Sequence, residues 1–364
     1  LSSRLRAHRV DGRALATLSS RAAAPFLREL FADLDGGRRG RPGPQRRLLV
    51  LTVELFLKMR HKLLSPQVSV DLVRERFCDL EVADGELQFG SMVGEGGYGR
   101  VYKARWMHVD VAAKVFRGGE TGKLSKDFYS ELCVLCRLRH PNITLLTGFC
   151  FRPKYTIVTE YMHGGSLYDL LHGKRPPSDW NFSQVVSIAR EICLAMVYLH
   201  ANDIVHCDLK SSNVLLNGPH EVKLCDFGLA HLLGDEPAAQ EQAGVTIGCV
   251  GTTHWMAPEV LRGEVYSKAA DVYSFGMILW EMISRNVPFE GYTAAQVIGL
   301  VGYGRRRPQS PRGCPEPLRA LLRRVLRPRP RSRCDFQELA EALGDLHRST
   351  VIDVEERLWT FFTG

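Results

Sequence analysis

The chain has 364 residues, of which 45% are hydrophobic and 24% charged, proportions that are ordinary for a globular protein of one or two domains. No apolar run approaches the roughly 18 residues of a membrane span, so we expect none. The net charge of +8 includes an arginine-rich stretch, residues 305–333, whose one carboxylate is Glu316. Because no aromatic residue interleaves with it, we expect no nucleic-acid binding. We interpret the stretch as a solvated basic face rather than a surface that attracts acidic peptides or membrane phosphates.

Strand patterns come first along the chain and helical patterns later. A Gly-, Pro- and Arg-rich loop is predicted at 36–47, and strands with tight glycine turns are predicted across 87–116 and at 155–161. Apolar residues at helical spacing predict helices at 127–138, 167–171, 182–200, 270–284, 294–302, 316–326 and 336–347. This order predicts an α+β fold of two lobes rather than alternating βαβ units.

A glycine-rich sequence, G-E-G-G-Y-G-R-V at 94–101, lies between two predicted strands. Glycines let a backbone approach phosphate oxygens without a Cβ clash. A Rossmann turn uses the same spacing, but here Val101 continues a strand instead of opening a helix. Lys114, in the next strand, can reach phosphates if Glu131 orients it. The predicted phosphate site is therefore Val93, Gly94, Glu95, Gly96, Gly97, Tyr98, Gly99, Val101, Lys114 and Glu131.

Residues 206–213, H-C-D-L-K-S-S-N, place an acid, a cation and an amide at fixed spacing. Asp208 can accept or orient a hydroxyl proton, and Lys210 can touch a γ-phosphate. Asn213 and Asp226 offer the neutral and the charged oxygen ligand that Mg²⁺ prefers beside phosphates. Phosphoryl transfer needs mainly positioning and charge neutralisation. We therefore predict Asp208, Lys210 and Asn213 as catalytic residues, Asn213 and Asp226 as metal ligands, and ATP and Mg²⁺ as cofactors.

These motifs make residues 86–347 resemble a eukaryotic protein kinase. A-P-E at 257–259 and D-V-Y-S-F-G at 271–276 carry the same resemblance. It implies a bilobal fold with a small β-rich N-lobe and a large helical C-lobe, and protein substrates. It also implies that Arg333 pairs with Glu259, that Asp271 anchors the catalytic loop, and that four residues stack between the lobes: Leu135, Leu146, His206 and Phe227.

The finer sequence is similar to the tyrosine-kinase-like group, which includes Raf, mixed-lineage and receptor-like kinases. A-R-W-M-H-V-D-V-A-A-K at 104–114 carries this likeness. Lys210 and Thr252 match the Ser/Thr-specific members. The resemblance further implies an adenine site with a hinge at 160–162, a small gatekeeper and an apolar sandwich: Glu160, Met162, Thr159, Val101, Ala112 and Leu215.

Cys207 departs from the kinase pattern, in which an arginine precedes the catalytic aspartate. That arginine pairs with a phosphorylated activation-loop residue, a contact that cysteine cannot make. Residues 226–259 contain no serine or tyrosine and only three threonines, Thr246, Thr252 and Thr253. One hypothesis is that activity does not depend strongly on loop phosphorylation. The other is that Cys207 is a tolerated change and that phosphorylation elsewhere controls the enzyme.

The first 60 residues are predicted to form a helical region. V-D-G-R-A-L-A-T-L at 10–18 resembles the core of a SAM domain, truncated at its start, which implies self-association or docking to partners. The alternative is a helical regulatory leader. A linker at 61–85 and a tail at 348–364 are predicted to flank the kinase-like domain.

The ten cysteines lack a disulfide-like spacing and indicate reduced thiols in a cytoplasmic protein. The leading prediction is an ATP-dependent serine/threonine kinase of intracellular signalling. One alternative is a pseudokinase scaffold that binds ATP or partners, which the presence of Lys114, Asp208 and Asp226 disfavours. A second is a kinase of tyrosine or dual specificity, which Lys210 and Thr252 disfavour.

Overall fold

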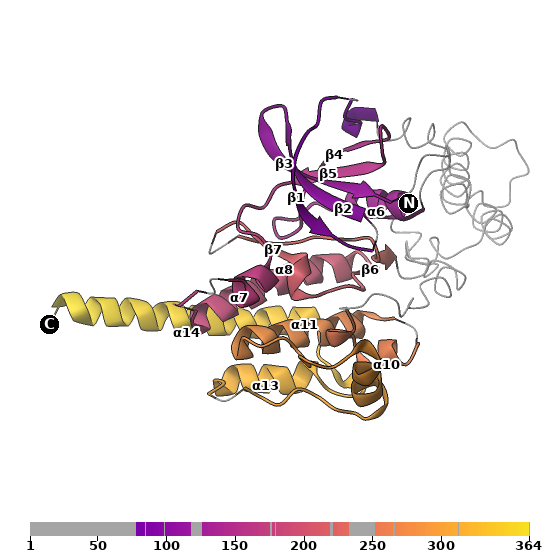
Figure 1. Cartoon of the computed structure of the whole chain (residues 1–364). Coiled ribbons are helices and arrows are strands. Elements are labelled where there is room, and N and C mark those ends of the chain that lie inside the picture. The colour runs from indigo at the N-terminus through magenta and orange to yellow at the C-terminus, as the bar shows by residue number, and fades with distance from the viewer. Residues whose placement is uncertain are drawn as a thin grey trace, which may run out of the picture. The chain divides into compact units, whose positions relative to one another are not determined.

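The computed structural model describes residues 78–363, except residues 84, 98, 118–125, 175, 176, 179, 219, 220, 233–251, 265 and 312. The predicted helical region at 1–60, its SAM-like sequence and most of the predicted linker lie outside the described residues. Within them, the strands of the largest sheet and one helix come first along the chain, and the other α-helices follow, with four short strands among them (Figure 1). A β-rich N-lobe is followed by a larger helical C-lobe, so the predicted α+β arrangement is confirmed.

The N-lobe is built on a five-stranded antiparallel sheet in the order β1-β2-β3-β5-β4. Its strands are β1 (Gln88–Glu95), β2 (Gly99–Trp106), β3 (Val109–Phe116), β4 (Leu146–Cys150) and β5 (Thr156–Glu160). Strand β4 was not predicted. It pairs only with β5 among the described strands, so β2, β3 and β5 lie inside the sheet and are paired along both edges.

Helix α6 (Lys126–Leu135) packs on this sheet through an aromatic cluster around Phe128. The Phe128 ring is fully buried, meets Phe116 edge-on with centroids 5.5 Å apart, and stacks on Tyr155 at 5.2 Å. Such pairs bury large apolar areas in defined geometries, which fixes the helix against the strands. Glu131 lies three residues further on, so it shares the face of α6 that Phe128 anchors.

The C-lobe contains seven described α-helices (Figure 1). They are α7 (Leu167–His172), α8 (Phe182–Ala201), α10 (Pro258–Leu261), α11 (Lys268–Ser284), α12 (Ala294–Val297), α13 (Glu316–Val325) and α14 (Phe336–Thr363). Helix α8 begins where Asn181 and Gln184 cap each other reciprocally. The stripe predicted for this helix is buried: Val185, Ile188, Ile192 and Met196.

Helix α8 is the one helix of the described chain that is long and apolar enough to cross a membrane, with 20 residues and a mean hydropathy of 1.4. Half of it is buried in the protein. It packs against α11 and α14, as Figure 1 shows for the long α14. The core helix of a globular domain passes the same test, and α8 has that position.

Two small sheets frame the catalytic-loop sequence. β6 (Ile204–Val205) pairs with β9 (His231–Leu232), and β7 (Val214–Leu216) pairs with β8 (Val222–Leu224). Residues 206–213 therefore leave one small sheet and enter the other, with a 3-10 turn at Ser211–Asn213. Strands of two or three residues are too short to give a periodic sequence pattern, so none was predicted.

Two predicted helices differ in the structure. The helix predicted at 294–302 begins as α12 but continues as a π-helix, η4 (Ile298–Tyr303). The helix predicted at 336–347 is too short, because α14 continues to Thr363. The predicted tail at 348–364 is thus helical up to that residue. No glycine or proline interrupts residues 345–363, so the backbone pattern contains nothing that would end the helix earlier.

Candidate active site

The strand register aligns the glycine-rich loop with the predicted phosphate-binding lysine. Gly94 of β1 lies opposite Val101 of β2, which lies opposite Lys114 of β3. Val93 is exposed on β1, and the Glu95 carboxylate accepts from Arg100 and Arg117 at 3.1 and 2.7 Å, which lowers its pKa. Tyr98 lies outside the described residues.

The glycines of this loop serve different purposes. A Cβ on Gly99 would lie 2.2 Å from the carbonyl oxygen of Val115, so the β2–β3 pairing itself requires glycine there. A Cβ on Gly96 or Gly97 would meet no described atom within 4 Å. The turn is closed by the Gly96 N–H, which donates to the Gly99 carbonyl at 2.9 Å. Gly96 and Gly97 thus leave open space over the backbone, which suits close approach by a phosphate.

Lys114 bridges two carboxylates from distant parts of the chain. Its ammonium lies 2.7 Å from Glu131 Oε2 and 2.6 Å from Asp226 Oδ1. Burial opposes its charge, but the two carboxylates outweigh burial and raise the pKa of Lys114. Burial raises the pKa of Glu131 to about 7, against the pull of Lys114. Gly228 has no side chain beside this cluster; a Cβ there would lie 3.1 Å from Glu131 Oε2.

The three predicted catalytic residues lie together in the loop between the small sheets. Lys210 Nζ lies 2.7 Å from Asp208 Oδ2, and Asn213 Nδ2 donates to the Asp208 carbonyl at 2.8 Å and to Oδ2 at 3.2 Å. The buried Asp208 Oδ1 has no hydrogen-bond partner among the described residues. Burial raises the pKa of Asp208, and Lys210 acts in the opposite direction. One carboxylate oxygen is therefore held by the protein while the other is available to a ligand.

The two predicted metal ligands are tied by a backbone contact. The N–H of Cys225, next to Asp226, donates to the Asn213 carbonyl at 3.0 Å. Partial burial acts to raise the pKa of Asp226, but Lys114 outweighs it and the pKa lies below its ordinary value. An ionised carboxylate and an amide oxygen are a donor set that suits Mg²⁺. The residues present therefore fit this ion.

The sequence model of the family described as "Protein tyrosine and serine/threonine kinase" matches residues 87–343. The chain belongs to this protein kinase family. Among curated relatives, the Arabidopsis thaliana serine/threonine-protein kinase STY46 is 35% identical over 74% of this chain and 46% of its own length. Serine/threonine-protein kinase CTR1 of the same plant is 35% identical over 75% of this chain and 33% of its own length.

A third Arabidopsis relative is named serine/threonine/tyrosine-protein kinase HT1. It is 36% identical over 71% of this chain and 66% of its own length. The chain thus spans from a third to two thirds of these relatives. All three names include serine/threonine kinase, in agreement with the serine/threonine type expected from the sequence.

One buried carboxylate of α11 holds the catalytic loop of this kinase. Asp271 Oδ2 accepts from the His206 N–H at 3.0 Å, and its Oδ1 accepts from the Cys207 N–H at 3.1 Å. His200 of α8 contacts Oδ2 at 2.9 Å. Cys207 has φ of 65°, a left-handed conformation that is unfavourable for a residue with a side chain. Asp271 therefore stabilises a strained turn immediately before Asp208.

The residues of the expected interlobe stack are all buried: Leu135, Leu146, His206 and Phe227. The rings of His206 and Phe227 have centroids 5.1 Å apart. The His206 ring also lies 3.2 Å from the Cys225 carbonyl oxygen. These contacts give His206 a structural position between the catalytic loop and the D-F-G sequence.

The expected adenine-site residues come from both lobes. Ala112 of β3 lies opposite Thr159 of β5, and Thr159 lies opposite Leu146 of β4. Leu215 of β7 is half-buried, and Met162 is buried after β5. The Glu160 carboxylate does not face an open site, since it binds Lys223 at 2.9 Å and accepts from the Leu145 N–H.

Glu281 is a residue that sequence reasoning missed. Its fully buried carboxylate joins three segments: it lies 2.9 Å from His172 of α7, and it accepts from Ser211 Oγ at 2.8 Å and from Trp255 Nε1 at 2.9 Å. Its signal in the sequence was a lone acid within the apolar run of α11. A charge at such a position needs partners, and here they include the catalytic loop.

Proposed function

We propose that this chain is a protein serine/threonine kinase that transfers the γ-phosphoryl group of ATP to a hydroxyl group of a protein. The observation that carries the proposal is Asp208, whose Oδ2 is bonded to Lys210 and Asn213 while its buried Oδ1 has no partner in the described chain. A buried carboxylate oxygen without a partner is unfavourable unless a ligand supplies one. A substrate hydroxyl is the partner that this chemistry calls for.

Each residue has a distinct part in the proposed transfer. Asp208 Oδ1 accepts the hydrogen of the incoming hydroxyl and orients its oxygen. Lys210, beside it, offers positive charge to the moving phosphoryl group. Lys114, held by Glu131, binds the phosphates that stay behind, and the open backbone of Gly96 and Gly97 leaves room for them. Positioning and charge, rather than a covalent protein intermediate, account for the reaction.

We propose Asn213 and Asp226 as the ligands of Mg²⁺, which when bound neutralises phosphate charge. Until it binds, the charge of Asp226 is balanced by Lys114 at 2.6 Å. The aspartate is thus kept ionised and in place for a cation. The adenine site remains a proposal from the family pattern, with Ala112 and Thr159 brought together by strand pairing.

Serine/threonine specificity is favoured by Lys210 and by the names of STY46 and CTR1. The name of HT1 includes tyrosine and keeps dual specificity as the second candidate. Thr252 begins a 3-10 turn, but its side chain lies outside the described set. The pseudokinase alternative is disfavoured by the intact Lys114–Glu131 and Asp208–Lys210 pairs.

The decisive experiment compares the full chain with Asp208→Asn and Ser212→Ala, using Mg-ATP and a mixed peptide library. Ser212 is an exposed neighbour in the same loop and serves as the matched control. We expect phosphoserine and phosphothreonine products, a rate that falls about 10²- to 10⁴-fold in Asp208→Asn, and little change in Ser212→Ala. Equal signals from wild type and Asp208→Asn would indicate a scaffold, and phosphotyrosine would change the substrate class.

Two hypotheses on Cys207 stay predictions. One is that activity depends little on loop phosphorylation, because Cys207 offers no cation to a phosphate; the other is that phosphorylation elsewhere controls the enzyme. Residues 233–251 lie outside the described residues. Self-association or docking through residues 1–60 and a cytoplasmic location also stay predictions. Cys193, Cys225, Cys314 and Cys334 are free thiols, which fits a reduced state.

A further inference from the structure

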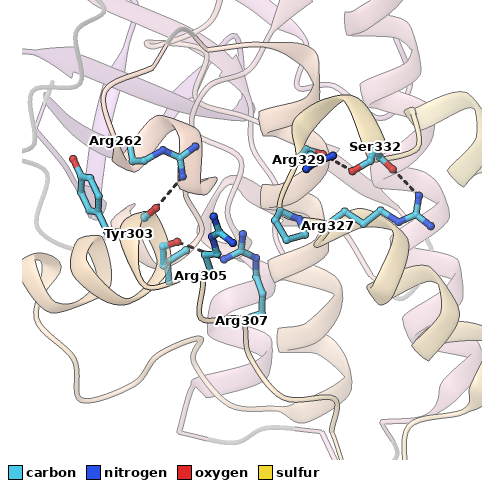
Figure 2. Close-up of a pocket in the computed structure, with 10 residues that line it drawn as sticks. Arg262, Tyr303, Arg305, Arg307, Arg327, Arg329 and Ser332 are labelled. Atoms are coloured by element: carbon cyan, nitrogen blue, oxygen red, sulfur yellow. Dashed lines mark hydrogen bonds between the residues drawn. The ribbon is translucent and has the colours of Figure 1, made fainter.

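The arginine-rich stretch lines a pocket in the C-lobe, away from the proposed active site. The pocket has a volume of about 760 Å³ and is lined by five arginines, Arg262, Arg305, Arg307, Arg327 and Arg329, with Tyr303 beside them (Figure 2). These residues come from three segments: the end of α10, the end of the π-helix η4, and the connection between α13 and α14. The fold therefore gathers charges that the sequence spreads over many positions.

Positive charge in this pocket is not balanced locally. The described lining residues include no aspartate or glutamate. Glu264 neutralises Arg262, at 2.6 Å, and the nearby Glu259 is taken up by Arg333, which does not line the pocket. Four lining arginines therefore lack a carboxylate partner among the described residues.

The guanidinium groups differ in how firmly they are held. Arg307 donates to the carbonyls of Leu326, Val301 and Arg306, and Arg327 donates to the carbonyl of Ser332 at 2.8 Å. Burial lowers the pKa of Arg307, with like charge from Arg333 and Arg262 acting in the same direction. Electrostatic crowding of this kind is relieved by a bound anion.

Arg305 and Arg329 are the most available cations. Both are exposed, and neither guanidinium has a hydrogen bond or ion pair within the described structure. Arg305 also has φ of 55°. It follows the π-helix and Gly304 at a left-handed position that glycine would occupy with less strain. An arginine thus occupies a position where backbone energetics favour glycine.

We propose that this pocket binds a small molecule or headgroup that carries two or more closely spaced phosphate groups. Guanidinium groups pair with phosphate oxygens in a bidentate way, and several around one concavity match clustered phosphates better than a single one. The volume lies within the roughly 300–1,000 Å³ of small-molecule sites. A concave pocket suits a compact polyanion, whereas an extended acidic peptide needs a groove. A soluble inositol polyphosphate and a phosphoinositide headgroup share this chemistry.

The test measures binding of inositol hexakisphosphate to the full chain by calorimetry. The pocket variant is Arg305→Gln/Arg329→Gln, and the matched control is Arg323→Gln/Arg331→Gln, which removes two exposed charges of the same stretch that do not line the pocket. We expect the pocket variant to weaken binding by about tenfold or more, and the control by less than about twofold. Arg305→Gly relieves the left-handed strain while removing the charge, so its weaker binding cannot be assigned to misfolding.

Three further arms distinguish the sources of the phosphates. Vesicles with phosphatidylinositol bisphosphate are compared with phosphatidylserine vesicles of equal charge, and a phosphoserine peptide is titrated in parallel. Binding of inositol hexakisphosphate alone would indicate a soluble ligand, and binding of the bisphosphate vesicles as well would indicate a lipid headgroup. Either result supports the proposal if the pocket variant loses that binding. Equal losses in both double variants, preference for the peptide, or no binding by the folded wild type would overturn it.

Discussion

The proposed active site and the arginine-lined pocket both contain positively charged side chains, but those of the active site are paired with carboxylates, whereas most of the pocket arginines lack such a partner among the described residues. In the active site, Lys114 lies within 2.7 Å of two carboxylates and Lys210 lies 2.7 Å from a third. In the pocket, Arg305 and Arg329 have no such partner among the described residues. The active-site cations are positioned by built-in counter-charges, which fixes them for chemistry. These two pocket arginines have no built-in counter-charge in the described part of the chain, which suits the binding of an incoming anion.

Removing a paired cation should have the largest effect on stability. Arg333 is next in sequence to a residue that lines the pocket, but it is paired with a carboxylate, like the lysines of the active site. It is 8% exposed and donates through both terminal guanidinium nitrogens to Glu259, which is 2% exposed. Arg333→Met leaves a buried carboxylate alone, and we expect a loss of about 3–5 kcal/mol in denaturant unfolding. Glu259→Leu added to Arg333→Met should recover much of this loss. A single variant as stable as wild type would contradict the comparison.

A smaller effect is expected from pH in the active site. The pKa of Glu131 rises from 4.5 in the unfolded chain to about 7 in the folded protein. Between these values the folded state keeps a proton that the unfolded state loses, so the free energy of unfolding falls as pH rises. Relative to Glu131→Gln, which stays neutral, wild type should lose at most about 3 kcal/mol between pH 4.5 and 7. Parallel stability curves for the two proteins across this range would show that Glu131 stays ionised.

The smallest effect is expected from an unpaired pocket cation. Arg329→Gln removes an exposed guanidinium without a described partner, so its free energy of unfolding should stay within about 0.5 kcal/mol of wild type. The measurement is the same denaturant titration as for Arg333→Met. A loss comparable with that of Arg333 would mean that the pocket arginines are structural, and the distinction between the two regions would fail.

Part of the arrangement around the candidate site could be predicted from the sequence. The glycine loop, Lys114, Asp208 and Asp226 each have a spacing that a folded chain must satisfy, and the structure brings Lys114 to both Glu131 and Asp226. The long helices could also be predicted, because a stripe such as that of α8 repeats over several turns. The end of α14 could not, since a helix without a stop signal is limited by packing rather than by sequence.

Features formed by residues that are distant in the sequence and meet only in the fold could not be predicted. Glu281 contacts residues 172, 211 and 255, which are far apart in the sequence, so no local sequence pattern predicts these contacts. The arginine stretch was interpreted as a solvated face, because its sequence does not show that Arg262 joins Arg305 and Arg329 around one concavity. Short strands such as β6 and β9 likewise exist only through their pairing.

The π-helix η4 sets the direction in which the chain leaves toward Arg305 and Arg307. A π-helix is commonly an α-helix with an inserted residue, and each α-helical residue turns the chain by about 100°. Deleting one residue from Ile298–Tyr303 would therefore wind this segment back into register with α12 and rotate the chain after Tyr303 by about that angle. The two arginines would then be carried around the helix axis, out of reach of Arg327 and Arg329. The number of residues in this turn thus determines whether the arginines after it line the pocket.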